Sequence, residues 1–200
     1  MHRNPWRSAT LLFFVCCCML LAACSPINVT VTVGQPSPTT SATSPSGTVK
    51  PTTGAAGAGN AALEHQIAQS VFAAVNKDRA AAGLPALQWS DALAKSAHQH
   101  DVAMMGANQL AHQVPGEPAL GERENQQGVQ WTFAAENVGF TTDMSTNGAL
   151  GLHKAMMAEQ PPDDGHRQNI LTTQANILGV DILLDTTHEK LWLTEDFAKA

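Results

Sequence analysis

The chain has 200 residues and a net charge of −6, from 11 lysines and arginines against 17 aspartates and glutamates. No basic segment accompanies this acidic balance, so the composition argues against a nucleic-acid partner. All four cysteines lie at or before Cys24, so the rest of the chain has no disulfide and no thiol nucleophile and must be held by its core, or by a core and a metal.

The N-terminus has the pattern of a bacterial secretion signal. Arg3 and Arg7 precede an apolar run over 11–23, which is too short for a stable membrane span. The run ends in LAAC, which resembles the lipobox, whose cysteine is acylated and becomes the first mature residue. We therefore expect 1–23 to be a lipoprotein signal peptide and Cys24 to be the lipidation site, with the membrane as a partner through this anchor.

An ordinary cleaved signal, with Cys24 lying near the cut by chance, is the alternative. Either interpretation predicts export, and the first places the protein on the outer face of a bacterial cell membrane or outer membrane. Residues 24–61 are then expected to be a flexible tether, because serine, threonine, proline, glycine and alanine dominate them and bury too little apolar surface to order a chain. Residues 62–200 remain as one domain.

The first half of this domain predicts two helices and a loop. Apolar residues recur at helical spacing between Asn60, a candidate cap, and Gly83, a candidate stop. After a turn, Ser90 is placed to cap a second helix over 91–108. The polar segment 113–130 contains two prolines and three glycines and is expected to be a long loop.

The second half predicts strands around one more helix. WTFAAENVGF, residues 131–140, is an expected strand, and residues 147–160 suit a helix that ends at the pair Pro161–Pro162. Two β-rich runs over 176–184 and 191–197 are joined by the polar DTTHEK, which indicates an antiparallel hairpin. This order predicts the α+β class, as an α-β-α sandwich.

Most histidines are expected to have no role in metal binding or catalysis. His65 and His153 occupy apparent solvated helix positions, and His188 lies in the hairpin loop. His98 and His100 are two residues apart, so on a helix they point to different faces and do not share a metal.

His112 and His166 have different settings. His112 lies where the second helix gives way to the loop, and His166 follows the sequence PPDDG, in which Asp163 or Asp164 could cap a helix over 165–171. The positive end of a helix disfavours imidazolium, and a neutral imidazole is what a metal ligand or a general base requires. No H-E-x-x-H, G-x-S-x-G, P-loop or paired C-x-x-C motif is present.

Several fragments occur in an order that resembles the CAP superfamily. They are VNKDRAAAGLPALQWSDALAKSAHQHDVAM, LAHQ, AENVGF, GHRQNIL and GVDILL…LWLTEDF, and together they span most of 65–200. This superfamily, also called SCP-like, includes cysteine-rich secretory proteins, venom antigens, plant pathogenesis-related proteins and many bacterial members. The resemblance implies a central antiparallel sheet between helical layers.

The resemblance also implies a cleft that holds two histidines and two acidic residues. Carried over to this chain, these four ligand-binding residues are His112, Glu136, Glu159 and His166. Ala135 replaces the usual glycine before the strand acid, and Met156 the usual tryptophan before the helix acid. Glu136 lies in an apolar strand, where a buried carboxylate needs a partner, for which the two histidines are the candidates.

Two functions follow from this resemblance. The first is an extracellular binding module, in which His112 and His166 hold zinc or another divalent metal as cofactor and an unknown extracellular ligand binds. The second is a zinc-dependent, protease-like hydrolase that uses Glu136 or Glu159 as a catalytic carboxylate. We favour the binding module, because the sequence specifies no substrate pocket and no oxyanion donors; a structural spacer is a third reading. Sterol binding, seen in disulfide-rich eukaryotic members, is not carried over to a domain without cysteines.

Overall fold

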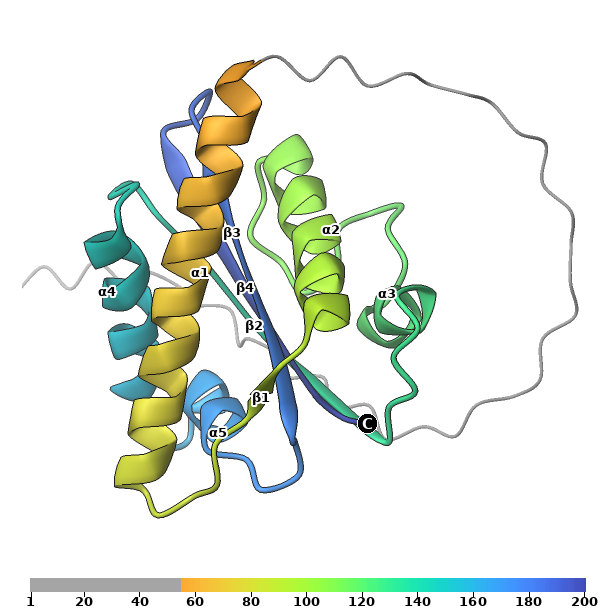
Figure 1. Cartoon of the computed structure of the whole chain (residues 1–200), viewed down its shortest axis with the longest axis vertical. Coiled ribbons are helices and arrows are strands. Elements are labelled where there is room, and N and C mark those ends of the chain that lie inside the picture. The colour runs from red at the N-terminus through yellow and green to blue at the C-terminus, as the bar shows by residue number, and fades with distance from the viewer. Residues whose placement is uncertain (1–54) are drawn as a thin grey trace, which may run out of the picture.

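The computed structural model describes residues 55–200, which form a four-stranded sheet between two layers of helices (Figure 1). This architecture confirms the predicted α+β class and its α-β-α sandwich. The expected signal peptide, Cys24 and the tether as far as residue 54 lie outside the described residues. Within the described range, every helix is too short or too polar to span a bilayer.

Three helices cover one face of the sheet (Figure 1): α1 (Ala55–Ala81), α4 (Thr146–Met157) and α5 (Gly165–Ile170). Because α1 begins before Asn60, that residue lies inside the helix and is not its cap, and the last residues of the expected tether are helical. Gly83 follows the end of α1 with φ +73°, a conformation that glycine adopts without steric cost. The predicted stop is therefore confirmed.

The opposite face carries α2 (Asp91–Ala107) and α3 (Leu120–Gln126). The Ser90 hydroxyl accepts the backbone N–H of Leu93 at 3.2 Å, so the predicted cap of α2 is confirmed. The expectation of a loop without secondary structure over 113–130 is wrong, because α3 lies within it. Hydrophobic periodicity could not indicate this helix, since its fully buried side chains are the charged Arg123 and Glu124.

The strands lie in the order β1-β3-β4-β2. Their bounds are β1 (Gln88–Trp89), β2 (Phe133–Thr141), β3 (Ile177–Asp185) and β4 (Lys190–Lys199). Strands β3 and β4 form the predicted antiparallel hairpin, and β2 pairs antiparallel with β4 at one edge of the sheet. Strand β1 pairs parallel with β3, in a segment expected to be a turn, so the sheet is mainly but not wholly antiparallel.

The central strand β4 is buried on both faces, and its alternate side chains serve different layers. Leu191, Leu193 and Phe197 belong to the hydrophobic core under α1, whereas Trp192 packs with Met104 of α2. Helix α2 approaches the sheet closely at Gly179 of β3, where a Cβ atom would lie 2.1 Å from a backbone nitrogen of α2. The sandwich thus has a hydrophobic core on each side of one sheet.

Candidate functional site

The first half of the site is a hydrogen-bonded pair between His112, which follows α2, and Glu136 of β2. The Nδ1 atom of His112 lies 2.9 Å from Oε1 of Glu136. The second carboxylate oxygen accepts a hydrogen bond from the guanidinium of Arg123 on α3. Glu136 is only 5% exposed and Arg123 is fully buried, so the strand carboxylate has the partner that its burial requires. One of the two expected histidine partners is present, and a buried arginine takes the place of the other.

Several effects determine the ionisation of Glu136. Burial alone would raise its pKa, but the hydrogen bond from His112 and the positive charges of His100 and Arg123 oppose burial. The net result is a pKa below the ordinary value for glutamate, so Glu136 is a carboxylate at neutral pH and accepts hydrogen bonds from both neighbours.

His100 supports the loop that carries His112. Its ring contacts Glu117 through Nδ1 at 2.9 Å and the carbonyl of Ala111 through Nε2 at 2.9 Å. The Glu117 carboxylate also accepts the backbone N–H of Val114 at 3.0 Å. The His100 side chain is fully buried. It does point to a different face from the exposed His98, as its spacing predicted.

The second half of the site pairs His166 with Glu159. Oε1 of Glu159 lies 2.5 Å from Nδ1 of His166, and Oε2 accepts the backbone N–H of the same residue at 3.0 Å. The expected capping of α5 by Asp163 or Asp164 is therefore wrong. Asp164 occupies the N-cap position without a side-chain cap and instead accepts a hydrogen bond from Gln168. Glu159 supplies the carboxylate at the start of α5.

Helix α5 is fixed against the sheet by buried polar side chains. Arg79 of α1 donates to the carbonyls of Ile170 at 2.8 Å and Thr172 at 2.7 Å, at the C-terminal end of α5. Asn137 of β2 donates to the carbonyl of His166 at 3.2 Å, and Asn169 donates to that of Glu136 at 3.2 Å. Adjacent residues of β2 therefore position the two histidine–glutamate pairs. No hydrogen bond joins the side chains of one pair to those of the other anywhere in 55–200.

His153 also departs from expectation. It was predicted to be solvated, but it is only 3% exposed, with Nε2 2.9 Å from Asp78 of α1 and Nδ1 3.7 Å from Glu195 of β4. Burial lowers the pKa of His153, but the hydrogen bonds and charges of Glu195 and Asp78 raise it by more, so the net shift is upward. His65 and His188 are exposed, as predicted.

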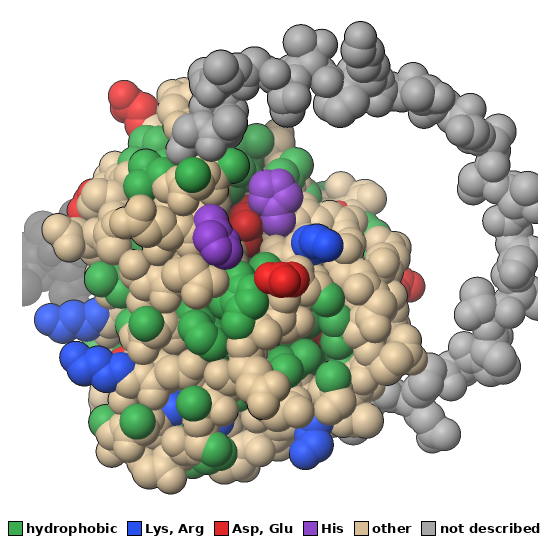
Figure 2. Space-filling model, in the orientation of Figure 1, with side chains coloured by type: hydrophobic (Ala, Val, Ile, Leu, Met, Phe, Trp, Pro, Cys, Tyr) green, Lys and Arg blue, Asp and Glu red, His purple; other side chains and the backbone are tan. Residues whose placement is uncertain are grey.

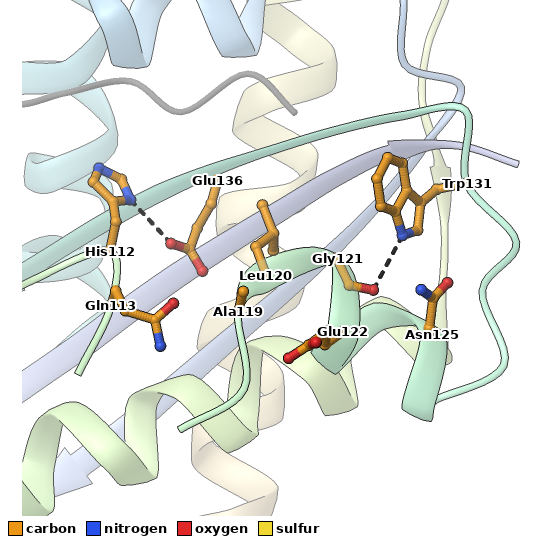
Figure 3. A pocket seen from close by; sticks show the side chains of 9 residues that line it. All are labelled: His112, Gln113, Ala119, Leu120, Gly121, Glu122, Asn125, Trp131 and Glu136. Carbon is orange, nitrogen blue, oxygen red and sulfur yellow. Dashed lines mark hydrogen bonds and ion pairs between the residues drawn. The ribbon is translucent and has the colours of Figure 1, made fainter. Parts of the chain in front are cut away.

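A cavity of about 310 Å³ opens beside the first pair (Figure 3). His112 and Glu136 lie at one end and Trp131 at the other, with Leu120 of α3 between them. The residues that line it do not include His166 or Glu159. On the face shown in Figure 2, histidine side chains flank a recessed acidic side chain next to a hollow with hydrophobic walls.

Among the contacts within 55–200, neither histidine commits its Nε2 atom to a hydrogen bond, whereas both Nδ1 atoms are bound by carboxylates. A carboxylate on Nδ1 fixes the ring and favours the tautomer whose Nε2 carries the lone pair, as in metal-ligating histidines. No group of three or more histidine, cysteine, aspartate or glutamate side chains in 55–200 is arranged to hold a metal ion. The four predicted residues therefore form two separate histidine–glutamate pairs, in which each carboxylate supports one imidazole.

Sequence reasoning identified all four residues of the two pairs but missed those that support them. Arg123, His100 and Glu117 lie under the first pair, and Asn137 and Asn169 lie under the second. No local pattern marks these residues, because each acts on a partner from another element. Arg123 differs from an ordinary surface arginine in being fully buried, and burial can be seen only in the folded chain.

An antiparallel hairpin and an edge strand between helical layers, with two histidine–glutamate pairs at that edge strand, define a class of domain. Residues 72–197 match the model of the CAP family, described as the cysteine-rich secretory protein family, and the chain belongs to this family. Among curated proteins, no sequence match is found.

Three solved structures have a similar fold. An extracellular SCP-domain protein from Bacillus anthracis has 25% identity and a TM-score of 0.61, covering 78% of this chain and 45% of its own. An outer surface protein of Borrelia burgdorferi has 16% identity and a TM-score of 0.57, covering 67% of this chain and 92% of its own. A cysteine-rich secretory protein from Staphylococcus aureus has 20% identity and a TM-score of 0.53, and the match covers 68% of this chain and 39% of that protein. This chain thus spans less than half of the first and third relatives. The relatives named here are secreted or surface proteins.

Proposed function

We propose that this protein is a binding module on the cell exterior, anchored by a lipid on Cys24, whose CAP domain uses His112 and His166 to hold a divalent metal such as zinc. The observation that carries the proposal is the shared geometry of the two histidines, each with Nδ1 on a carboxylate and with Nε2 unbonded by any side chain or backbone group of the described part of the chain. Family membership and the secreted or surface relatives support the location.

The metal would present a positive centre to an oxygen or nitrogen atom of an extracellular ligand. The residues of this chain orient the two imidazoles and exclude water from the buried side of Glu136, which is 5% exposed. Glu136 and Arg123 form an ion pair in which their charges cancel. The carboxylate that binds His112 is therefore not an uncompensated buried charge.

The hydrolase alternative requires a carboxylate that is free to accept a proton from water. Both carboxylates are already bound to imidazole Nδ1 atoms, and one is also bound to Arg123. This engagement supports binding over hydrolysis, because a base must reach the proton that it removes.

Calorimetric titration of the full-length protein with zinc tests the proposal. His112→Ala and His166→Ala should each abolish binding, since each removes one of two imidazole donors. Glu159→Gln keeps the ring but weakens its acceptor, and should lower the zinc affinity by about tenfold to a hundredfold. Affinity should also fall as the pH is lowered, because zinc must displace protons from imidazole.

His65→Ala is the matched control, because His65 is an exposed histidine on α1 that belongs to neither pair. Its zinc affinity should equal that of the wild type. Wild-type affinity in His166→Ala would leave His166 with a structural role at the start of α5 and would refute the two-histidine site.

A further inference from the structure

The cavity beside His112 has a second end, which the two histidine–glutamate pairs do not use. Trp131 forms the wall there, and Gln113, Glu122 and Asn125 project around the space between (Figure 3). At about 310 Å³ the cavity is at the lower end of the range for small-molecule sites. It is therefore large enough for one compact ligand group and too small for a long acyl chain.

Trp131 is held rigidly. Its indole Nε1–H donates to the carbonyl of Gly121 at 3.1 Å, and a Cβ atom on Gly121 would lie 2.4 Å from the indole ring. The glycine thus allows the indole to lie against α3, and the hydrogen bond fixes its orientation. A fixed aromatic surface facing a cavity binds a flat apolar face at little cost in side-chain entropy.

The polar groups of the cavity favour an uncharged, hydroxyl-rich ligand. Two amides, from Gln113 and Asn125, and two carboxylates, from Glu122 and Glu136, line it. None of its lining residues in 55–200 is a lysine or arginine, so the Trp131 end offers an anionic ligand carboxylates rather than a basic side chain. Glu122 and Asn125 are exposed and bond to no other side chain within 55–200. Carboxylate and amide groups beside a fixed indole combine hydroxyl recognition with an apolar platform, which suits a sugar ring.

A peptide that adds to the sheet is disfavoured at this site. Strand β2 is the edge strand, but the carbonyl of Glu136 already accepts a hydrogen bond from Asn169. Strand addition needs free backbone groups on the edge next to the pocket. The edge at Glu136 does not offer them.

The geometry points to this cavity as a binding site for one ring of a neutral glycan, with the apolar face of the ring on Trp131 and its hydroxyl or acetamido groups bonded to Gln113, Glu122 and Asn125. This inference rests on the proposed role as an exterior binding module. It does not require the metal.

Nuclear magnetic resonance titration of the full-length protein tests the inference, with the indole N–H signal of Trp131 as the reporter. The probes are triacetylchitotriose, cellotriose and the peptide trialanine. We expect a saturable shift with at least one of the two glycans and none with the peptide. Trp131→Leu should weaken glycan binding by about tenfold, because it removes the aromatic platform.

Two further variants separate binding from folding. Asn125→Ala changes an exposed side chain and should weaken glycan binding without altering the unfolding temperature. Gly121→Ala keeps the indole but displaces it and should also weaken binding, measured by calorimetry. Trp89→Phe is the matched control, since Trp89 packs on Phe72 at the other side of the domain and should leave glycan affinity unchanged.

The glycan and metal proposals can fail separately. Saturable binding of trialanine alone, or no saturable shift with any probe, would overturn the glycan site. Glycan binding that survives both Trp131→Leu and Asn125→Ala would also exclude this cavity. Zinc titration of Trp131→Leu should give wild-type affinity, so a protein that binds glycan but no zinc would refute only the metal site.

Discussion

Each carboxylate of the site holds a histidine and a structural group at the same time. Glu136 binds the Nδ1 atom of His112 and neutralises the buried Arg123, whereas Glu159 binds the Nδ1 atom of His166 and accepts the backbone N–H at the start of α5. Among the described residues, removing Glu136 would leave the buried Arg123 with only its 3.5 Å ion-pair contact to Glu117, and losing one partner of a buried ion pair is strongly destabilising. Glu159, with 23% of its side chain exposed, is the better position for testing histidine orientation without unfolding the domain.

A different buried acid, Glu124 of α3, has no function in the site. It is fully buried, and neither of its carboxylate oxygens has a hydrogen-bond partner within the described residues. Burial first, and then the charge of Asp196, raise the pKa of Glu124 to about 9, against an opposing effect of Arg123. Glu124 is therefore protonated at neutral pH, which lowers the cost of leaving it in the interior.

We expect Glu124→Gln to stabilise the domain at alkaline pH. Between the unfolded pKa of 4.5 and the folded pKa of about 9, the native state retains a proton that the unfolded chain releases. Stability from this group is thus complete below 4.5 and declines as pH rises, by at most about 1.4 kcal/mol per pH unit. Glutamine has the same shape and does not ionise, so urea denaturation should show a smaller decline in the variant.

The control for this prediction is Glu122→Gln on the same helix, because Glu122 is exposed and its substitution should leave the pH dependence unchanged. Parallel stability curves for the wild type and Glu124→Gln would mean that Glu124 is already ionised in the folded protein.

At the scale of the elements, strand β4 separates two chemically different layers. Its alternate residues place Leu191, Leu193 and Phe197 in the core under α1, and Thr194 and Asp196 among buried polar groups on the side of α2. Asp101 of α2 accepts a hydrogen bond from Thr194 at 2.6 Å. Burial, followed by the charge of Asp181, raises the pKa of Asp101 well above its ordinary value. The layer between α2 and the sheet therefore contains acids that are protonated rather than paired with bases.

The close contact between α2 and β3 predicts a large effect at Gly179. A Cβ atom there would lie 2.1 Å from the backbone nitrogen of Ala94, so Gly179→Ala must push the helix away from the sheet. We expect a loss at or above the upper end of about 1–3 kcal/mol in the free energy of unfolding. Chemical denaturation followed by circular dichroism measures it.

Gly151→Ala provides the comparison, because Gly151 lies in α4 with no atom within 4 Å of the added Cβ. Alanine should stabilise the helix there by about 0.5–1 kcal/mol. Equal stability of the two variants would show that α2 does not pack on β3 as described.

For the whole molecule, attachment to the membrane is expected to depend on Cys24 rather than on surface charge. The chain has a net charge of −6, and losing Arg3 and Arg7 with the signal would make it more negative by two. Anionic head groups would repel such a surface weakly. Acylation of one cysteine by more than one chain would outweigh this repulsion.

Cys24→Ser should therefore move the protein to the soluble fraction or leave the precursor unprocessed. Cell fractionation and intact-mass measurement of the product check this. Cys18→Ser, within the expected apolar run, is the control and should be processed and anchored normally. A Cys24→Ser product that stays membrane-bound with the mass of the wild type would refute acylation.

Much of the architecture could be predicted because it depends on neighbours in the sequence. The Ser90 cap, the Gly83 stop and the hairpin of β3 and β4 are local patterns, and the structure confirms them. The ordered motifs also named His112, Glu136, Glu159 and His166, since each lies in a recognisable fragment of the CAP family.

Only the tertiary structure determined how these residues are supported. Helix α3 was not predicted because its fully buried side chains are charged rather than apolar. Strand β1 was not predicted because it has only two residues, which form a strand by pairing with β3. The buried states of His100 and His153, and the role of Glu159 at the start of α5, depend on partners from other parts of the chain. A hydrophobic pattern treats each polar side chain as costly to bury, because it takes no account of partners elsewhere in the fold. The buried side chains of His100 and His153 are hydrogen-bonded or ion-paired, and these contacts offset that cost. The sequence by itself therefore named the four residues of the predicted site, and the three-dimensional pairing of charges determined how those residues are held.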